Sequence, residues 1–149
     1  MILSFFLATL LATGGLFQQV SPMATDELSY RVLYSSNRPG GRSIGYVVSV
    51  DHLLDRNQIE KLICRVLLNE KAPTSSIVGV SIYYKLDKYV PTGGLPNLEA
   101  ELREHDVADY LWNADFPGAR KRLTVIRDAK GNILDPPQAN EFDHTTACR

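Results

Sequence analysis

The sequence predicts an α+β fold in which one main helix packs on one face of a mixed or antiparallel sheet. Several segments alternate apolar and polar residues, the pattern of half-buried strands, whereas residues 56–70 repeat apolar residues at helical spacing. These segments follow the order β-β-α-β, an insertion, and then β-β. Because the helix and the strands each have an apolar face, a helix layered against a sheet buries them together.

The first two strands form a predicted β-hairpin. "YRVLYSS" and "SIGYVVSV" both alternate, and "NRPGG" between them has the Pro and Gly content of a turn. The residues expected to share one face are Tyr30, Val32 and Tyr34 in the first strand and Ile44, Tyr46, Val48 and Val50 in the second.

A strong start signal marks the main helix. Asp55 is expected to cap it, with Gln58 as the other half of a capping box and with Leu54 and Ile59 as a hydrophobic staple. Pro73 places its end near residues 69–72. The predicted apolar stripe consists of Ile59, Leu62, Ile63, Val66 and Leu67.

Three further strands follow the helix. "SIVGVSIYY" is expected as a central strand, "KRLTVIR" is a clear strand, and "DAKGN" is a turn with Gly131 at positive φ. "VADYLWN" suits both periods, but its aromatic content and the following "ADFPG" turn favour a strand. Within the insertion, "LPNLEAELREH" is expected to form a short helix with Leu95, Leu98 and Leu102 inward. "DPPQANEFDHTTACR" reads as an irregular tail.

The hairpin, the capped helix, "VGVSIYYKLDKYV" and "VADYLWNADFPGARKRLTVI" together resemble small exported bacterial domains of unknown function. The resemblance covers residues 30–127, with a longer insertion between Tyr89 and Asp106 in this chain. It implies the α+β fold and export, and it implies no catalytic residue.

The N-terminal residues 1–24 are predicted to be a signal peptide, followed by a single domain over residues 25–149. Their apolar run from Ile2 to Leu11 has the length of a signal core, and small residues allow cleavage near Gly14 or before Thr25. We therefore expect a periplasmic or secreted protein with no stable membrane anchor after cleavage. If translation starts at Met23, the protein is cytoplasmic instead.

Composition excludes several classes of function. The 149 residues suit one globular domain, and a formal net charge of -1 argues against nucleic-acid binding. The chain contains no P-loop, dinucleotide fingerprint, G-x-S-x-G or H-E-x-x-H motif, so no cofactor is predicted.

The two cysteines, Cys64 and Cys148, leave several readings open. Cys64 lies too far into its helix for the dipole to activate it, and structural zinc needs about four ligands. The favoured interpretation is a disulfide that ties the C-terminal tail to the helix. The alternative is that Cys64 is a small buried apolar residue and Cys148 is a free thiol.

The histidines and acids offer weaker sites. His105, Asp106 and Asp109 stand close enough in sequence for an acid-base cluster, although "EAELREHD" is more simply a solvated acidic face. His144 and Cys148 have an H-x3-C spacing, but two ligands on a tail do not make a metal site, and no metal is predicted.

Exposed aromatic and basic residues suggest a binding surface. Acidic residues dominate residues 97–115 and basic residues dominate residues 117–130, a split that suits a protein-protein contact or pairing within the fold. The residues singled out for binding are Arg38, Arg42, Tyr83, Tyr110, Trp112, Arg120, Lys121 and Arg122.

The sequence is therefore compatible with two functions. The favoured one is a small exported binding or accessory protein without catalysis, whose partner is another envelope or extracellular protein. The alternative is a hydrolase-like enzyme with its acid-base cluster at His105, Asp106 and Asp109.

Overall fold

The structure is a computed structural model that describes residues 28–38, 40, 42–70, 76–115 and 120–149. The predicted signal peptide, residues 1–24, lies outside the described residues, as do parts of the turns predicted at residues 37–41 and 114–118. Among the described residues, no helix has both the length and the apolar character needed to cross a membrane.

The described residues form six strands and three helices. The strands are β1 (Tyr30–Asn37), β2 (Ser43–Val50), β3 (Ile77–Tyr84), β4 (Asp106–Asn113), β5 (Arg120–Arg127) and β6 (Ile133–Glu141). The helices are α1 (Arg56–Asn69), α2 (Pro96–Arg103) and α3 (His144–Ala147).

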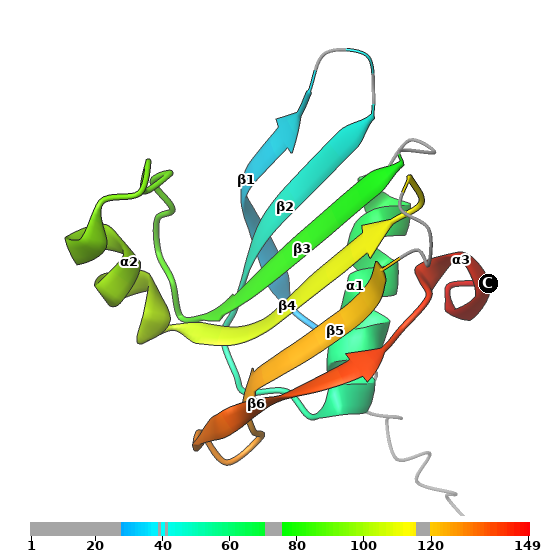
Figure 1. Ribbon diagram of the computed structural model, residues 1–149. Coiled ribbons are helices and arrows are strands. Elements are labelled where there is room, and N and C mark those ends of the chain that lie inside the picture. Colours follow the sequence, from blue (N-terminus) through cyan, green and yellow to red (C-terminus); the bar gives the residue numbers. More distant parts are fainter. Residues whose placement is uncertain (1–27, 39, 41, 71–75, 116–119) are drawn as a thin grey trace, which may run out of the picture.

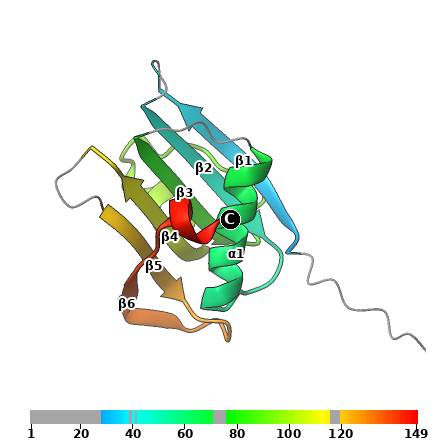
Figure 2. The same cartoon turned by 90° about the vertical axis from the view of Figure 1, so that its right-hand side faces the viewer.

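The strands make one mixed sheet in the order β1-β2-β3-β4-β5-β6 (Figure 1). All neighbours pair antiparallel except β2 and β3, which are parallel because α1 connects them as a crossover. Helices α1 and α3 lie on the same face of the sheet (Figure 2). This arrangement confirms the predicted α+β fold with one main helix on a sheet face, although strands dominate it.

The apolar stripe of α1 is buried as predicted. Its five apolar residues are all in the core, and Leu54 before the helix is 1% exposed. The capping box is present, because the Gln58 amide donates to the Asp55 carboxylate at 2.9 Å and the Asp55 amide donates to the Gln58 side chain at 2.9 Å. The helix therefore begins where local chemistry satisfies its first free N–H groups.

A β-bulge in β1 separates residues predicted to share one face of that strand. Val32 pairs with Val48, but Tyr34 pairs with Val47, so the register shifts between Val32 and Tyr34. Tyr34 is consequently on the opposite face from Val32 and stacks on Tyr89 with ring centroids 5.4 Å apart. The expectation that Tyr34 shares a face with Tyr30 and Val32 is wrong, because strict alternation does not anticipate an extra residue.

The predicted irregular tail is wrong over much of its length, because β6 pairs with β5 there. Arg122 lies opposite Glu141 and Val125 opposite Gln138. The two prolines, Pro136 and Pro137, lie where the register shifts, so they interrupt no regular ladder. An edge strand tolerates proline because one side of its backbone has no strand partner.

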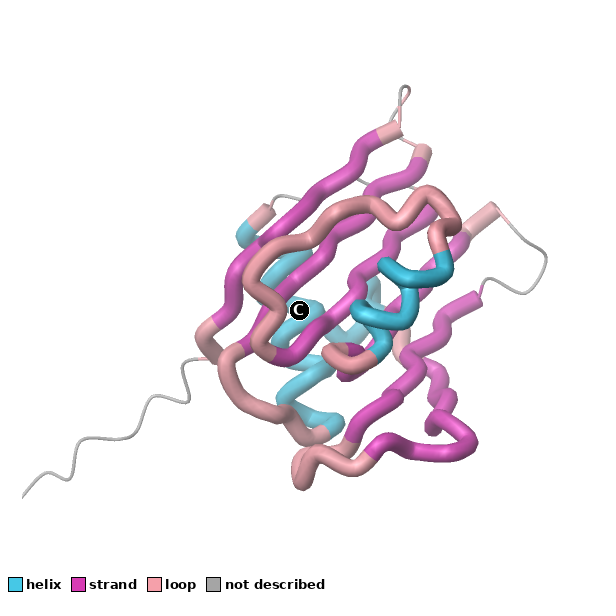
Figure 3. Tube along the Cα trace, turned by 90° about the vertical axis from the view of Figure 1, so that its left-hand side faces the viewer, coloured by secondary structure: helices cyan, strands magenta, loops and turns pink. Residues whose placement is uncertain are grey.

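The insertion between β3 and β4 covers part of the other sheet face (Figure 3). The connection after β3 and helix α2 cross in front of the strands, with α1 behind them. Leu86 in this connection is 6% exposed and Leu98 and Leu102 are half-buried, but Leu95 is 60% exposed. The short helix is confirmed, and the inward placement of Leu95 is wrong.

Candidate functional site

Cys64 and Cys148 form the predicted disulfide, which joins α1 to the residue after α3. Their Cα atoms are 5.1 Å apart and their sequence separation is 84. Neither cysteine is free. The bond excludes a free catalytic thiol at Cys64 and removes Cys148 as a thiolate ligand for a metal.

An ion pair also holds the start of α3. Asp143 caps the helix by accepting from the Thr145 amide at 3.1 Å, and its other carboxylate oxygen pairs with Lys121 of β5. The hydrogen bond from Lys121 and the bonds from Thr145 lower the pKa of Asp143 to about 2. Asp143 is therefore ionised at neutral pH and locks α3 to the sheet.

His144 fixes α3 to the centre of the sheet. Its Nδ1 lies 2.7 Å from the Tyr110 hydroxyl, and its ring meets Trp112 edge-on with centroids 5.1 Å apart. Burial lowers the pKa of His144. Tyr110, expected on a binding surface, is 2% exposed, and Trp112 is packed against the core, so both support α3 instead.

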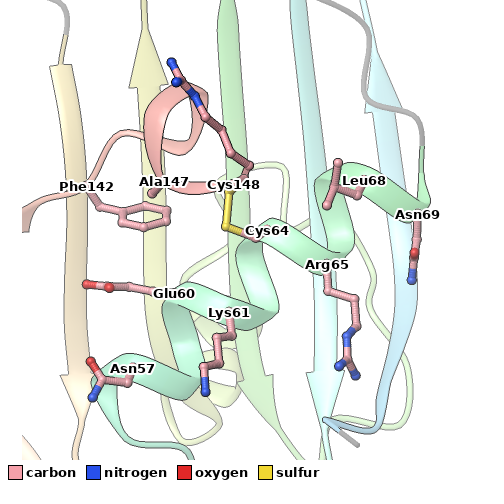
Figure 4. Close-up of a pocket in the computed structure, with 11 residues that line it drawn as sticks. Asn57, Glu60, Lys61, Cys64, Arg65, Leu68, Asn69, Phe142, Ala147 and Cys148 are labelled. Atoms are coloured by element: carbon pink, nitrogen blue, oxygen red, sulfur yellow. A yellow bond between two sulfur atoms is a disulfide. The ribbon is translucent and has the colours of Figure 1, made fainter.

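A groove runs along the outer face of α1 beside α3, with a volume of about 600 Å³ (Figure 4). We call it the helix groove. Its lining residues are Asn57, Glu60, Lys61, Cys64, Arg65, Leu68, Asn69, Phe142, Ala147, Cys148 and Arg149. Its wall on the α3 side is the C-terminal segment, which the disulfide joins to α1.

The helix groove combines an apolar patch with positive charge. Leu68 is 64% exposed, although it belongs to a helix whose other described leucines are buried. Lys61 and Arg65 precede it at positions i−7 and i−3, so the three side chains share one side of the helix. The groove therefore offers both an apolar contact and positive charge on one surface.

A second hollow of about 360 Å³ continues the helix groove toward the start of the described domain. It is lined by Leu28, Ser29, Tyr30, Arg65 and Asn69, and therefore shares Arg65 and Asn69 with the groove. Arg65 donates to the Leu28 carbonyl at 3.2 Å, and Asn69 donates to the Tyr30 hydroxyl at 2.8 Å. These bonds join α1 to the start of β1 and to Leu28 just before it, at the second end of the groove.

A smaller pocket of about 230 Å³ lies between the sheet and α2. We call it the carboxylate pocket. Burial, and then repulsion from Asp109, raise the pKa of Asp106 to about 6. Asp109 is exposed when the whole residue is considered. Its carboxyl group is nevertheless surrounded by protein atoms, and this burial raises the pKa of that group. The lining residues are Tyr83, Thr92, Glu99, Leu102, Arg103, Asp106 and Asp109.

Of the predicted acid-base cluster, only the two aspartates meet. His105 does not line the carboxylate pocket, and its Nδ1 lies 2.8 Å from the carbonyl oxygen of Tyr84. Tyr83, predicted as a binding residue, does line it, and burial raises the pKa of its phenol. The pocket therefore holds two carboxyl groups and a phenol that remains protonated at neutral pH, without an imidazole.

The predicted basic residues do not form one cluster. Arg120, Lys121 and Arg122 alternate along β5; Lys121 pairs with Asp143, whereas Arg122 donates to the Thr124 hydroxyl at 3.1 Å. Arg38 and Arg42 are exposed at the end of the β1–β2 hairpin. The register of β2, β3, β4 and β5 places Arg42 and Arg120 at the same end of the sheet.

Part of the basic segment is structural. The Arg127 guanidinium donates to the carbonyl oxygens of Glu104 at 2.7 Å, Gly131 at 3.0 Å and Asp106 at 3.2 Å. The opposed acidic and basic segments thus meet in part within the fold.

Sequence reasoning missed the residues of the helix groove. Lys61, Arg65 and Leu68 lie on the side of α1 that the apolar stripe leaves to solvent, and Arg149 joins the lining only because the C-terminal segment is held beside α1 in the folded protein. Leu68 directly after the stripe was the available signal, because it is a large apolar residue on an otherwise polar helix side.

Comparison with known proteins adds no further residue. No protein-family model, no curated protein and no solved structure matches the chain. The resemblance to small exported bacterial domains thus supplies no site, and the proposals below rest on the geometry of the chain itself.

Proposed function

We propose that this protein is an exported, disulfide-stabilised binding protein without catalytic activity, and that it contacts its partner through the helix groove. The observation that carries the proposal is the groove itself: a cross-linked C-terminal segment forms one wall, and Leu68 stands 64% exposed inside it. A surface held in shape before binding loses little conformational entropy when its partner arrives.

The disulfide supports export. Structural disulfides form and persist in secreted and periplasmic proteins, whereas cytosolic thiols are kept reduced. Cys64–Cys148 lies in a chain that begins with an uncharged apolar run, and both features fit the same route. The bond lies in the wall of the groove, so the cross-linked form of the binding surface would exist only after export.

Export is tested by the intact mass of the protein from its native host, measured without reduction and again after reduction and thiol alkylation. We expect a chain that starts at Thr25 or near Gly15 and thiols that are labelled only after reduction. A chain starting at Met23 or Ala24 with both thiols free would contradict export and the disulfide together.

Binding through the groove is tested by site-specific photo-cross-linking in the host. A photoreactive amino acid replaces Leu68 in one variant and Ile133 in a control, because both side chains are 64% exposed. We expect a cross-linked partner from position 68 and none from position 133. No product from position 68, or the same product from both, would remove the groove as the contact surface.

A second function is favoured by one observation, the pairing of Asp106 and Asp109 in the carboxylate pocket. An Asp106 pKa of about 6 is suited to a general acid near neutral pH, and Asp109 beside it is a second carboxyl group whose pKa is also raised by burial. The test is hydrolysis of ester, phosphate and glycoside substrates by the wild type and by Asp106→Asn, Asp109→Asn and His105→Ala variants. Activity lost in both aspartate variants but kept in His105→Ala would support this pocket; an inactive wild type would leave the binding proposal.

A further inference from the structure

We propose that the helix groove binds an acidic segment of a partner protein, with one large apolar side chain of that segment packed against Leu68 and the disulfide. This inference rests on the proposed binding function and names its partner class. It is drawn from the charge, the shape and the apolar content of the groove.

The charge of the groove is positive. Lys61, Arg65 and Arg149 line it, and Glu60 is its one acidic side chain. Glu60 is already paired with Arg56, whose Nε lies 2.9 Å from its carboxylate. Cations therefore exceed anions even if a main-chain carboxylate at Arg149 is counted, and a segment carrying carboxylates would complement them.

The free cations are placed for a ligand. Among the described contacts, neither Lys61 nor Arg149 forms a salt bridge or a side-chain hydrogen bond. One N–H of Arg65 donates to the Leu28 carbonyl at 3.2 Å. This bond holds the guanidinium beside the groove and leaves its other N–H groups available as donors. A fixed guanidinium binds a carboxylate with less loss of side-chain entropy than a mobile one does.

The apolar patch argues against a small inorganic anion. Leu68 is 64% exposed, and the groove is also lined by the disulfide and, on the other side of the disulfide from Leu68, by Ala147 and Phe142 (Figure 4). Leu68 is seven residues after Lys61, which corresponds to roughly 10 Å along a helix. An extended segment covers that distance in about three residues, so the partner is expected to carry an acidic residue about three positions from its large apolar residue.

The number of cations argues against nucleic acid as the occupant. Three basic residues line the groove and the formal net charge of the chain is -1, whereas nucleic-acid affinity depends on neutralising many phosphates. A partner segment with a few carboxylates matches the groove in charge and in length.

The test uses a phage library of random 12-residue peptides, panned on the oxidised full chain in its exported form. Enriched peptides are then measured individually by fluorescence anisotropy, with a charge-reversed version of each as a ligand control. We expect enriched peptides that carry at least two acidic residues and one large apolar residue, and binding that weakens as salt is raised from 50 to 300 mM.

Matched variants locate the binding. We expect Lys61→Glu with Arg149→Glu to weaken peptide binding roughly tenfold or more, and Leu68→Ser to weaken it by a similar factor. Lys88→Glu with Lys130→Glu makes the same change of charge on exposed residues outside the groove, and Ile133→Ser removes an equally exposed apolar side chain, so both controls should bind normally. All variants are compared by thermal unfolding, and the substituted groove residues are exposed enough to leave the midpoint unchanged.

Enrichment of basic or uncharged peptides, no enrichment at all, or equal binding by the groove and control variants would overturn the acidic-partner inference. The cross-linking experiment separates this failure from failure of the proposed function. A partner captured from position 68 that lacks an acidic segment would keep the binding function and reject only the partner class.

Discussion

The hydroxyl group of Tyr110 lies 2.7 Å from Nδ1 of His144, and this bond connects the middle of the sheet to α3 across a sequence separation of 34. The His144 amide also donates to that hydroxyl at 3.3 Å. Together with the Asp143–Lys121 pair and the disulfide, this contact anchors the segment that walls the helix groove. The shape of the groove is therefore determined by the core of the domain.

Replacing Tyr110 with Phe should lower the free energy of unfolding by about 1 kcal/mol, because it removes the hydroxyl and leaves the half-buried imidazole of His144 without its partner. The measurement is urea unfolding at pH 7. Tyr89→Phe is the control, because no hydrogen bond of its hydroxyl occurs among the described contacts. A double-mutant cycle with His144→Ala should give a coupling energy above about 0.5 kcal/mol. Additive effects would mean that the bond does not contribute.

Replacing both cysteines with Ser should lower the free energy of unfolding by about 2–4 kcal/mol, because the bond closes a loop of 84 residues in the unfolded chain. The same variant should lose protection from hydrogen exchange at α3 before the sheet does. Wild-type protein measured with and without a reductant gives an independent comparison. Equal stability of the oxidised and reduced forms would show that the non-covalent contacts of α3 suffice.

Asp143→Asn isolates the charge of the cap, since Asn also accepts a hydrogen bond at a helix N-cap. The pKa of Asp143 is about 2 in the folded state against an ordinary value of 3.8, so its ionised form stabilises the fold above about pH 4. This stabilisation should disappear as the pH falls from about 4 to 2. We expect the variant to be less stable at pH 7 by roughly 0.5–1 kcal/mol, after allowance for solvent screening.

The difference between wild type and Asp143→Asn should shrink toward zero at about pH 2. Lys121→Met should reproduce the loss at neutral pH. A difference that stays constant from pH 7 to pH 2 would show that the Lys121 pair has no energetic role.

Asp106→Asn should stabilise the protein at neutral pH. Its pKa is raised to about 6, so the folded state binds a proton more tightly than the unfolded state, and wild-type stability falls as the pH rises from about 4 to 6. With allowance for partial exposure, we expect the variant to gain about 1 kcal/mol at pH 7 and nothing below pH 4. Asp87→Asn, whose wild-type side chain is 98% exposed, should change little. An Asp106→Asn variant that is less stable than the wild type at pH 7 would contradict the raised pKa of Asp106 in the folded state.

Local chemistry made several elements predictable. The side chains of Asp55 and Gln58 each accept a hydrogen bond from the other residue's backbone N–H, and the apolar stripe of α1 repeats every three to four residues. Both patterns can be recognised in the sequence before any tertiary contact is known. β6 was not predictable in the same way. Its pairing with β5 depends on a partner strand and on its position at the edge, where two prolines are tolerated.

The sequence by itself determined which segments become the central strands and the main helix, because hydrophobic period and capping are local properties. It also limited the cysteines to a small set of roles, and the disulfide was the favoured one. Only the tertiary structure decided which charged residues share a surface. Lys61 and Arg149 line the same groove because the disulfide and the other contacts of α3 place the C-terminal segment beside α1, whereas His105 lies outside the carboxylate pocket of Asp109, with its Nδ1 against the Tyr84 carbonyl. Sites made from distant segments depend on three-dimensional packing, which residue spacing does not encode.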